Sequence, residues 1–502
     1  MSGAVESEIT EYKPPVFDQV LGHPKPLWML FMSEFWERFA FYGIRWALVL
    51  YIVAQFYGGE GSGEESASKL YGAYLALVYA GAIFGGYIAD RVIGYQRSIL
   101  LGAVFMAAGL FMIAMPNPDV FKFGLATIIA GNGLFKPNIS TMVGKLYSPT
   151  DERRDSGFTI FYMGINLGAM IAPILTGYLA SHVFGTVDFP AYKVVFISAG
   201  IGMLISLVWF WFGRVQLQGI GRPIEADGGG KAKVLYVIIG ALLAIPLIYF
   251  LLSISATTLQ WYVLFPMFAL LCIMIMVEGI KDGSVARDRA IAMLIIFTFN
   301  ILFWMFFEQA GSSFTFLADK IVDKNIFGFA WPVAWFQSVN SLAIIVFAPI
   351  MAWMWVKLGS ANPSIPRKFG LGIIFNGLAF LLLMFALTKL LNDAGMIPFW
   401  TLFMVYVIQS IGELCLSPIG LSMVTKLAPL RLVGLGMGGW FLSTGIGNNL
   451  SGIFASEVSG ESGMSAASAL SGYTSGFTIL MIGGLILFFA APLIQKLMHG
   501  VK

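Results

Sequence analysis

The sequence is short of charge. Only 11% of its 502 residues are Asp, Glu, Lys or Arg, while 58% are hydrophobic. A soluble domain carries about 25% charged residues, so this composition indicates a polytopic membrane protein whose surroundings are the lipid bilayer. The formal net charge of +3 is small and is spread between loops, so it reports on topology. A nucleic-acid-binding surface is therefore not expected.

Cysteine and histidine are scarce as well. Cys272 and Cys415 lie in apolar stretches without CxxC spacing or a plausible metal partner, so both are expected to be small core residues. His23, His182 and His499 fall near the ends of apolar runs or outside them. Proton chemistry inside the membrane must therefore use carboxylates. Neither a metal ion nor another cofactor is expected.

Long apolar runs fill the rest of the chain. Runs of about 20 residues or more are candidate membrane helices. Fourteen are expected, at 28–56, 70–90, 98–116, 121–147, 156–181, 193–213, 234–253, 260–280, 290–316, 331–357, 368–391, 397–427, 432–456 and 474–498. The polar start of the chain runs straight into the first of them, so no cleavable signal peptide is expected.

The order of these runs predicts five regions in an all-α membrane protein. The predicted regions are a cytosolic N-terminus (1–27), an N-terminal six-helix bundle (28–215), a linker with two extra transmembrane helices (216–286), a C-terminal six-helix bundle (287–498) and a cytosolic tail (499–502). Basic residues flank the spans on one side, and the alternate loops, such as 58–68 and 253–260, hold few or none. Both termini are thus expected in the cytosol, as in a multi-pass protein of the inner (plasma) membrane.

The first apolar run, 28–56, contains four formal charges, which is unusual for a helix that spans a membrane. Glu34, Glu37, Arg38 and Arg45 share one helical stripe with Tyr42. A charge at the bilayer centre costs about 2.5–3.5 kcal/mol on insertion scales, so such residues face a polar interior and usually mark an ion or substrate path. The alternative is a structural ion-pair cluster that ties helices together.

Three more charges lie deep in other runs, and the helical rise of about 1.5 Å per residue gives their depths. Arg45 lies about 26 Å from the inner end of its helix and Glu308 about 27 Å from the inner end of its own, so both are expected near the outer face. Lys136 and Glu413 lie in the inner half. Buried charges need partners, so two pairs are predicted, Arg45 with Glu308 and Lys136 with Glu413. They would act as alternating gates, unless each charge merely faces a wet cavity.

Polar and aromatic residues at similar depths complete a candidate cavity. They are Tyr79, Asn166, Trp304, Gln309, Asn340 and Trp440. Each alone is weak evidence, because membrane helices often bury one such residue for packing.

A short loop carries a further motif, GGYIADRVIGYQR, at 85–97. It resembles the loop signature of the major facilitator superfamily, which is built from two six-helix halves with a binding site near the midplane between them. Asp90 and Arg91 in this loop are expected to serve gating and structure rather than substrate binding, with Asp90 capping a neighbouring helix end.

Five motifs, in order along the chain, resemble the proton-dependent oligopeptide transporter family. These are ExxERF from Glu34, GNGLFKPNIS from Gly131, FYMGINLG from Phe161, WFQSVN from Trp335 and GELCLSP from Gly412. The two extra helices resemble those of the bacterial members. The departures include Phe41, which stands where a tyrosine is common, and Ser341, which stands where a proline is usual.

This resemblance implies proton-coupled import of di- and tripeptides by alternating access. It places Arg45 and Lys136 on the peptide carboxylate, and Glu413 and Asn340 on the amino terminus. The remaining roles it implies are backbone contacts from Tyr42, Tyr79 and Asn166, side-chain pockets lined by Trp304 and Trp440, and proton coupling through Glu34, Glu37, Arg38, Glu308 and Glu413. Gln309 is expected to complete the substrate cavity.

Other transport activities stay open from the residues alone. Some members of the same family prefer nitrate or other substrates, including drug-like peptidomimetics, and a proton–drug antiporter is a further alternative. An intramembrane enzyme would need a nucleophile–base or metal set in the spans, and the sequence offers neither. A channel would need a polar-lined pore and would not need the two predicted ion pairs that act as gates.

Overall fold

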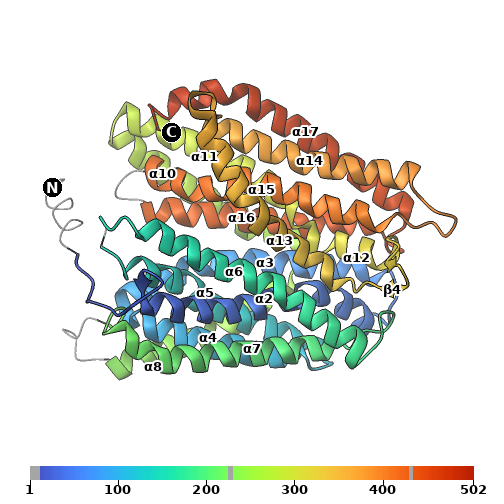
Figure 1. The fold of residues 1–502 in the computed structure, drawn as a ribbon, viewed down its shortest axis with the longest axis horizontal. Coiled ribbons are helices and arrows are strands. Elements are labelled where there is room, and N and C mark those ends of the chain that lie inside the picture. Colours follow the sequence, from blue (N-terminus) through green and yellow to red (C-terminus); the bar gives the residue numbers. More distant parts are fainter. Residues whose placement is uncertain (1–11, 149, 224–229, 429–432, 502) are drawn as a thin grey trace. The chain divides into compact units, whose positions relative to one another are not determined.

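The computed structural model describes residues 12–148, 150–223, 230–428 and 433–501. These residues are almost wholly helical (Figure 1). The long helices are α2 (Lys25–Phe56), α3 (Gly63–Ile88), α4 (Tyr95–Ile113), α5 (Pro118–Gly144), α6 (Arg154–Tyr178), α7 (Tyr192–Gly213), α8 (Gly230–Ser253), α10 (Phe265–Lys281), α11 (Ser284–Phe307), α13 (Ala334–Leu358), α14 (Ile365–Lys389), α15 (Phe399–Leu427), α16 (Val433–Ser459) and α17 (Ala466–Leu497). Hydrocarbon offers no partner for backbone N–H and C=O groups, so apolar segments of this length fold as helices.

Short elements extend or connect these helices. Three π-helical turns, Ala89–Ile93, Leu179–Val183 and Gln260–Leu264, continue α3 and α6 and join α9 (Ala256–Leu259) to α10. Three 3-10 turns follow α7, α11 and α13 at Arg214–Leu217, Glu308–Gly311 and Gly359–Ala361, and α12 (Ser313–Lys320) follows the second of them. The strands β1 (Gln19–Val20) with β2 (His23–Pro24), and β3 (Asn325–Ile326) with β4 (Phe329–Ala330), form two small antiparallel hairpins.

Each predicted span coincides with a helix. Within the described ranges, twelve helices are long and apolar enough to cross a membrane; α5 and α16, which carry several buried amide and hydroxyl side chains, are not among them. The predicted boundaries differ at polar ends. For example, α3 begins at Gly63 rather than 70, and α17 at Ala466 rather than 474. Helix α17 starts with a capping box formed by Ser465 and Ser468, a signal that hydropathy does not register.

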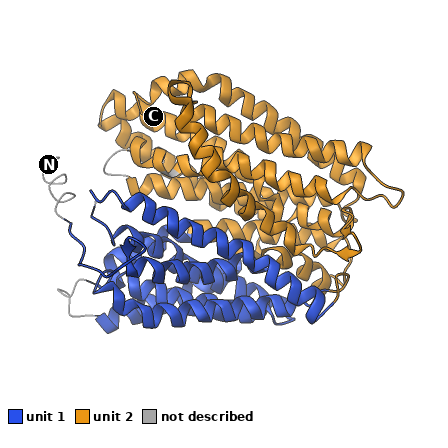
Figure 2. Ribbon diagram, in the orientation of Figure 1, with its two compact units in different colours: residues 1–44, 81–185, 190–250 blue, residues 45–80, 186–189, 251–502 orange. Residues whose placement is uncertain are grey.

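The chain packs into two compact units (Figure 2). Unit 1 contains residues 1–44, 81–185 and 190–250, and unit 2 contains residues 45–80, 186–189 and 251–502. Helices α2 and α3 contribute to both units. The boundary between the units falls between Ile44 and Arg45 in α2 and between Ala80 and Gly81 in α3. The units follow close packing rather than chain order, so the five predicted regions stay a prediction.

The two additional helices attach to different units. In unit 1, the ring of Tyr249 near the end of α8 stacks on Phe123 of α5 with ring centroids 4.1 Å apart, and its hydroxyl donates to Asp119 over 2.8 Å. In unit 2, Asn449 of α16 donates to the carbonyl of Ala256 over 2.9 Å and to Gln260 over 2.8 Å, which fixes the α9–α10 segment. Both attachments use hydrogen bonds near an end of the additional helical segment.

Glycines allow a close helix crossing in unit 2. A Cβ at Gly72 of α3 would lie 2.8 Å from the carbonyl oxygen of Asn448 and from the Cα of Gly452 on α16. A Cβ at Gly445, further along α16, would lie 2.9 Å from the carbonyl oxygen of Ala76. The two helices therefore meet backbone to backbone along this crossing.

Candidate functional site

In unit 1, the acidic residues of α2 surround one arginine. Arg38 donates from Nη2 to Oε1 of Glu37 over 2.6 Å, and its Nε lies 3.3 Å from Oε1 of Glu34. All three side chains are almost completely buried, and Asn132 of α5 donates to Glu37 over 3.2 Å. Oε2 of Glu34 has no hydrogen-bond partner within the described part of the chain. Two carboxylates thus share one guanidinium in this cluster.

The same arginine also faces the next turn of α2. Its guanidinium carbon lies 5.0 Å from the centroid of the Phe41 ring and 5.9 Å from that of Tyr42. Cation–π attraction to two rings holds the guanidinium against its own helix. The half-buried Tyr42 thus lies directly beside the cluster of Glu34, Glu37 and Arg38.

Lys136 and Asn166 are the other predicted substrate residues of unit 1. Lys136 lies on α5, is half-buried, and is close enough to Glu34 to attract its carboxylate. Pro137 follows it inside the helix and removes one backbone hydrogen bond there. Asn166 on α6 is buried and donates to the carbonyl of Tyr162 over 3.0 Å. Lys136 belongs to unit 1 and Glu413 to unit 2, so their pairing stays a prediction.

In unit 2, Arg45 and Glu308 form the predicted outer ion pair. Nη2 of Arg45 lies 2.6 Å from Oε2 of Glu308, and Nε of Arg45 donates to the hydroxyl of Tyr71 over 3.1 Å. Arg45 is 8% exposed and Glu308 7%. Glu308 is the first residue after α11, in the 3-10 turn that precedes α12. The pairing predicted from helix depth is therefore confirmed, and its gating role stays a prediction.

Glu413 and Asn340, also in unit 2, are hydrogen-bonded to each other. The amide of Asn340 on α13 donates to Oε2 of Glu413 over 3.1 Å and to the hydroxyl of Ser410 over 2.8 Å, both on α15. Glu413 is also close enough to Arg45 and Glu308 to interact with both charges. Unit 2 thus brings two carboxylates, one guanidinium and one amide into a single electrostatic cluster.

The predicted aromatic and amide residues of unit 2 are held in different ways. The indole N–H of Trp304 donates to Asn300 over 3.0 Å, so the half-buried ring is fixed in orientation. Gln309 is fully buried and its amide donates to the hydroxyl of Ser451 on α16 over 3.0 Å. Tyr79 on α3 is half-buried. These contacts place the residues without testing their substrate roles.

Trp440 on α16 packs against aromatic neighbours. Its ring centroid lies 6.3 Å from that of Phe297 and 6.0 Å from that of Phe369, and only 5% of the residue is exposed. The absence of a side chain at Gly420 leaves room for the indole. Trp440 is therefore part of the apolar core of unit 2, and its substrate contact stays a prediction.

Within the motif at 85–97, residues 89–93 form a π-helical turn between α3 and α4 rather than a capped helix end. Asp90 and Arg91 are both exposed, and the carboxylate of Asp90 accepts a hydrogen bond from the hydroxyl of Tyr95. The N-cap of α4 is Gly94, which has φ 79° and no side-chain capping bond. Asp90 thus braces the start of α4 through Tyr95, because a glycine is needed at the cap position itself.

Several contributing residues are absent from the sequence-based prediction. Tyr71 and Asn132 each donate to or accept from a predicted charge, yet neither differs from a packing residue by its sequence position. Glu64, in the first turn of α3, is completely buried. It pairs with Lys320 at the end of α12 and accepts from the backbone N–H of Met464 over 2.9 Å. The sequence places Glu64 in a loop at 58–68, whereas the structure places it in α3, in a second charged contact of unit 2.

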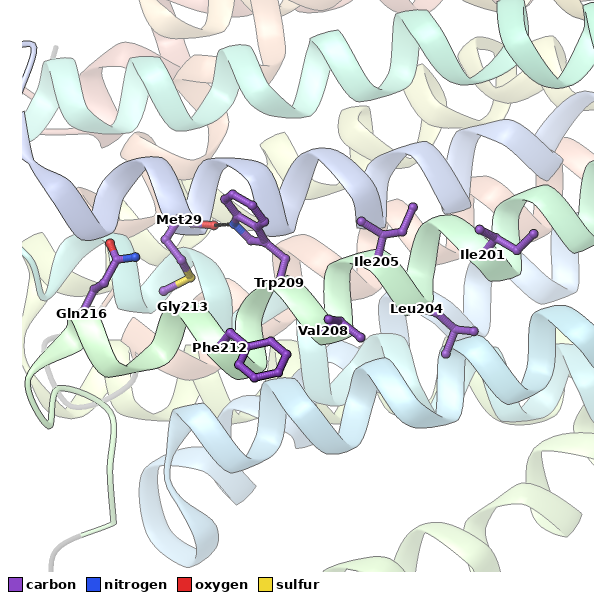
Figure 3. A pocket seen from close by; sticks show the side chains of 9 residues that line it. All are labelled: Met29, Ile201, Leu204, Ile205, Val208, Trp209, Phe212, Gly213 and Gln216. Carbon is purple, nitrogen blue, oxygen red and sulfur yellow. Dashed lines mark hydrogen bonds between the residues drawn. The ribbon is translucent and has the colours of Figure 1, made fainter.

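A surface groove of about 510 Å³ lies between α2 and α7 in unit 1 (Figure 3). Its walls are apolar side chains such as Ile205 and Phe212, and Trp209 in its middle donates to the carbonyl of Met29 over 3.2 Å. None of the predicted site residues lines it. Within the described ranges, no three His, Cys, Asp or Glu side chains are gathered as a metal ion would require.

Comparison with known proteins gives one consistent family. The sequence profile of the POT family matches residues 96–469. Peptide transporter YePEPT of Yersinia enterocolitica subsp. palearctica is 37% identical over 88% of this chain and 89% of the relative. Dipeptide and tripeptide permease B of Edwardsiella piscicida is 34% identical over 84% of both chains. The uncharacterized transporter YclF of Bacillus subtilis is 34% identical over 96% of both chains.

Solved structures agree with these relatives. The crystal structure of peptide transporter POT in complex with sulfate superimposes with a TM-score of 0.79 at 33% identity, covering 99% of both chains. That of a POT family transporter in complex with 5-aminolevulinic acid has a TM-score of 0.80 at 31% identity and covers 97% of this chain. They confirm the predicted fold, an all-α multi-pass membrane transporter of the major facilitator type with two extra helices. By sequence and by structure alike, the chain belongs to the POT family.

Proposed function

We propose that this protein is a proton-coupled symporter that imports di- and tripeptides by alternating access. The relatives named as peptide transporters or as dipeptide and tripeptide permeases support the substrate class. The observation that carries the mechanism is the set of buried carboxylates paired with arginines: Glu34 and Glu37 with Arg38, and Glu308 with Arg45. Buried carboxylates beside cations can exchange a proton for a salt bridge, which is what coupling requires.

The outer pair would act as a gate that a proton releases. A proton on Glu308 removes its negative charge, so that Arg45, still bonded to Tyr71, could bind an anionic group of the substrate. A peptide carboxylate is such a group. Glu413 and Asn340 lie in the same cluster and supply an acceptor for the ammonium group at the other end of a peptide.

The remaining predicted residues complete the proposed path. Lys136 would attract the peptide carboxylate from α5, and its pairing with Glu413 would form the inner gate. Further substrate contacts are proposed for Tyr42, Tyr79, Asn166, Trp304, Gln309 and Trp440. Proton coupling would involve Glu34, Glu37, Arg38, Glu308 and Glu413, with Asp90 and Arg91 supporting gating. We place the protein in the inner (plasma) membrane with both termini in the cytoplasm, as the basic flanks suggest, and assign it transport rather than catalysis.

Uptake of a labelled dipeptide into proteoliposomes, with and without an imposed pH gradient, tests this proposal. The expected result is accumulation above the external concentration only when the outside is more acidic. Accumulation that ignores the gradient would contradict coupling. The same vesicles decide between substrates, because a related structure holds 5-aminolevulinic acid. Competition by that amino acid or by nitrate without competition by dipeptides would indicate another substrate, and outward drug flux would indicate an antiporter.

A further inference from the structure

A second apolar groove, of about 380 Å³, opens between the additional helix α8 and helices α3 and α5, all within unit 1. Apolar side chains from the three helices form its walls. Six of them are Phe84, Ile88, Ile129, Leu134, Tyr236 and Ile248. None of the residues proposed for transport lines the groove, so it needs its own explanation.

Polar contacts hold α8 near its two ends, on either side of the groove. At one end Arg97 donates to the carbonyl of Gly230 over 3.3 Å, and at the other Tyr249 donates to Asp119 over 2.8 Å. In between, a Cβ built on Gly240 would meet no atom within 4 Å. Opposite it, α3 and α5 pack so tightly that a Cβ at Gly133 would lie 2.9 Å from the carbonyl oxygen of Gly81. The groove is therefore bounded on one side by the tightly packed α3–α5 pair and on the other by α8.

The groove has the length and depth of one lipid chain. From Tyr236 to Ile248 it follows α8 for about 18 Å, compared with about 15 Å for half of the hydrocarbon core of a bilayer. Ile88, next to the end of α3, and Tyr236, near the start of α8, mark the end that lies towards the membrane surface. Inside a membrane the surrounding medium is hydrocarbon, so an acyl chain is the occupant that this depth supplies.

Positive charge gathers at the mouth of the groove. Arg91 and Lys231 are exposed there, and Lys233 lies one turn before Tyr236. Arg97 joins them through its contact with Gly230, the first residue of α8. The nearby carboxylate of Asp90 is occupied by Tyr95. Clusters of Lys and Arg between helices at the cytoplasmic surface are sites for anionic lipid headgroups.

We propose that this groove binds one anionic phospholipid. Its acyl chain would lie between α8 and the α3–α5 pair, and its phosphate would face Lys231, Lys233 and the two arginines. The lipid would fill the space beside the middle of α8 and would connect this helix to α5, the helix that carries Lys136. A second copy of the chain docked on the same face is the competing occupant, which the experiment below separates.

Native mass spectrometry of the purified full-length protein with added phosphatidylglycerol or phosphatidylethanolamine measures this binding. One phosphatidylglycerol should bind in preference to phosphatidylethanolamine. The double variant Lys231→Gln/Lys233→Gln should weaken phosphatidylglycerol binding about thirtyfold, about fivefold for each lysine. Lys193→Gln, an exposed lysine at the start of α7, is the matched control and should bind as the parent does.

The apolar wall is tested separately. Gly240→Phe places a ring in the open space and should reduce binding of both lipids, whereas Leu243→Phe should not, because Leu243 of α8 is 71% exposed and does not line the groove. Thermal unfolding of each variant serves as the folding control, and the lysine variants keep the test valid if Gly240→Phe is poorly folded. Equal retention of the two lipids, lysine variants that bind like Lys193→Gln, or a mass of two copies in place of one lipid would each overturn the proposal.

Discussion

Arg45 and Glu308 form a buried ion pair of 2.6 Å although they are 263 positions apart in the chain. Arg45 lies in α2, and Glu308 begins the turn between α11 and α12. Removing one member of a buried pair strands the other charge and typically costs about 3–5 kcal/mol. A pair of this kind is stable only while both charges are present, which makes it responsive to a proton.

For Glu308→Gln we expect proton-driven dipeptide accumulation to fall at least about tenfold, because the amide cannot gain or lose a proton. Exchange of labelled for unlabelled dipeptide, which needs no net proton movement, should persist. Uptake and counterflow in the same proteoliposomes measure both. Glu278→Gln, which breaks an exposed pair with Lys281, is the control and should match the parent. Full accumulation by Glu308→Gln would remove this residue from the coupling mechanism.

For Glu37→Gln we expect proton-driven uptake to be abolished. The carboxylate is completely buried against Arg38 and Asn132, so its charge sets the balance of the cluster on α2. Asn132→Leu, which keeps the charge and removes one hydrogen bond, should retain partial uptake. Undiminished accumulation by Glu37→Gln under a pH gradient would contradict this role.

For Lys136→Ala we expect loss of dipeptide transport in both uptake and counterflow, because the proposed contact with the peptide carboxylate is lost. Lys122→Ala, on the same helix but near its other end, is the matched control. Normal dipeptide counterflow by Lys136→Ala would count against a substrate role for this lysine.

Glu64 and Lys320 provide a test by stability. Lys320→Met removes the cation from the fully buried carboxylate of Glu64 and keeps its hydrogen bond from the N–H of Met464. Unfolding free energy should drop by about 2 kcal/mol, below the range for a fully buried pair because Lys320 is partly exposed. The double variant Glu64→Gln/Lys320→Met should recover part of this loss in a thermal-unfolding cycle. Additive losses would show that the two side chains are not coupled.

The spans and the Arg45–Glu308 pair could be predicted from sequence for physical reasons. A long apolar run in hydrocarbon has to be helical, and a constant rise converts residue number into depth. The contact of Glu64 could not be predicted, because an acidic residue in the first turn of a helix usually faces water. Nor could the binding of Gln309 to Ser451, since depth does not determine which direction around a helix an amide points.

The glycine crossing of α3 and α16 has a consequence for motion within unit 2. Where Gly72 and Gly452 touch, no side chains interlock, so a small tilt or slide requires no rotamer to change. Only backbone atoms resist movement at such a crossing. A larger residue at Gly72 would push the two helices apart or restrict them to one crossing angle, so this freedom depends on the absence of a Cβ at Gly72 and Gly452.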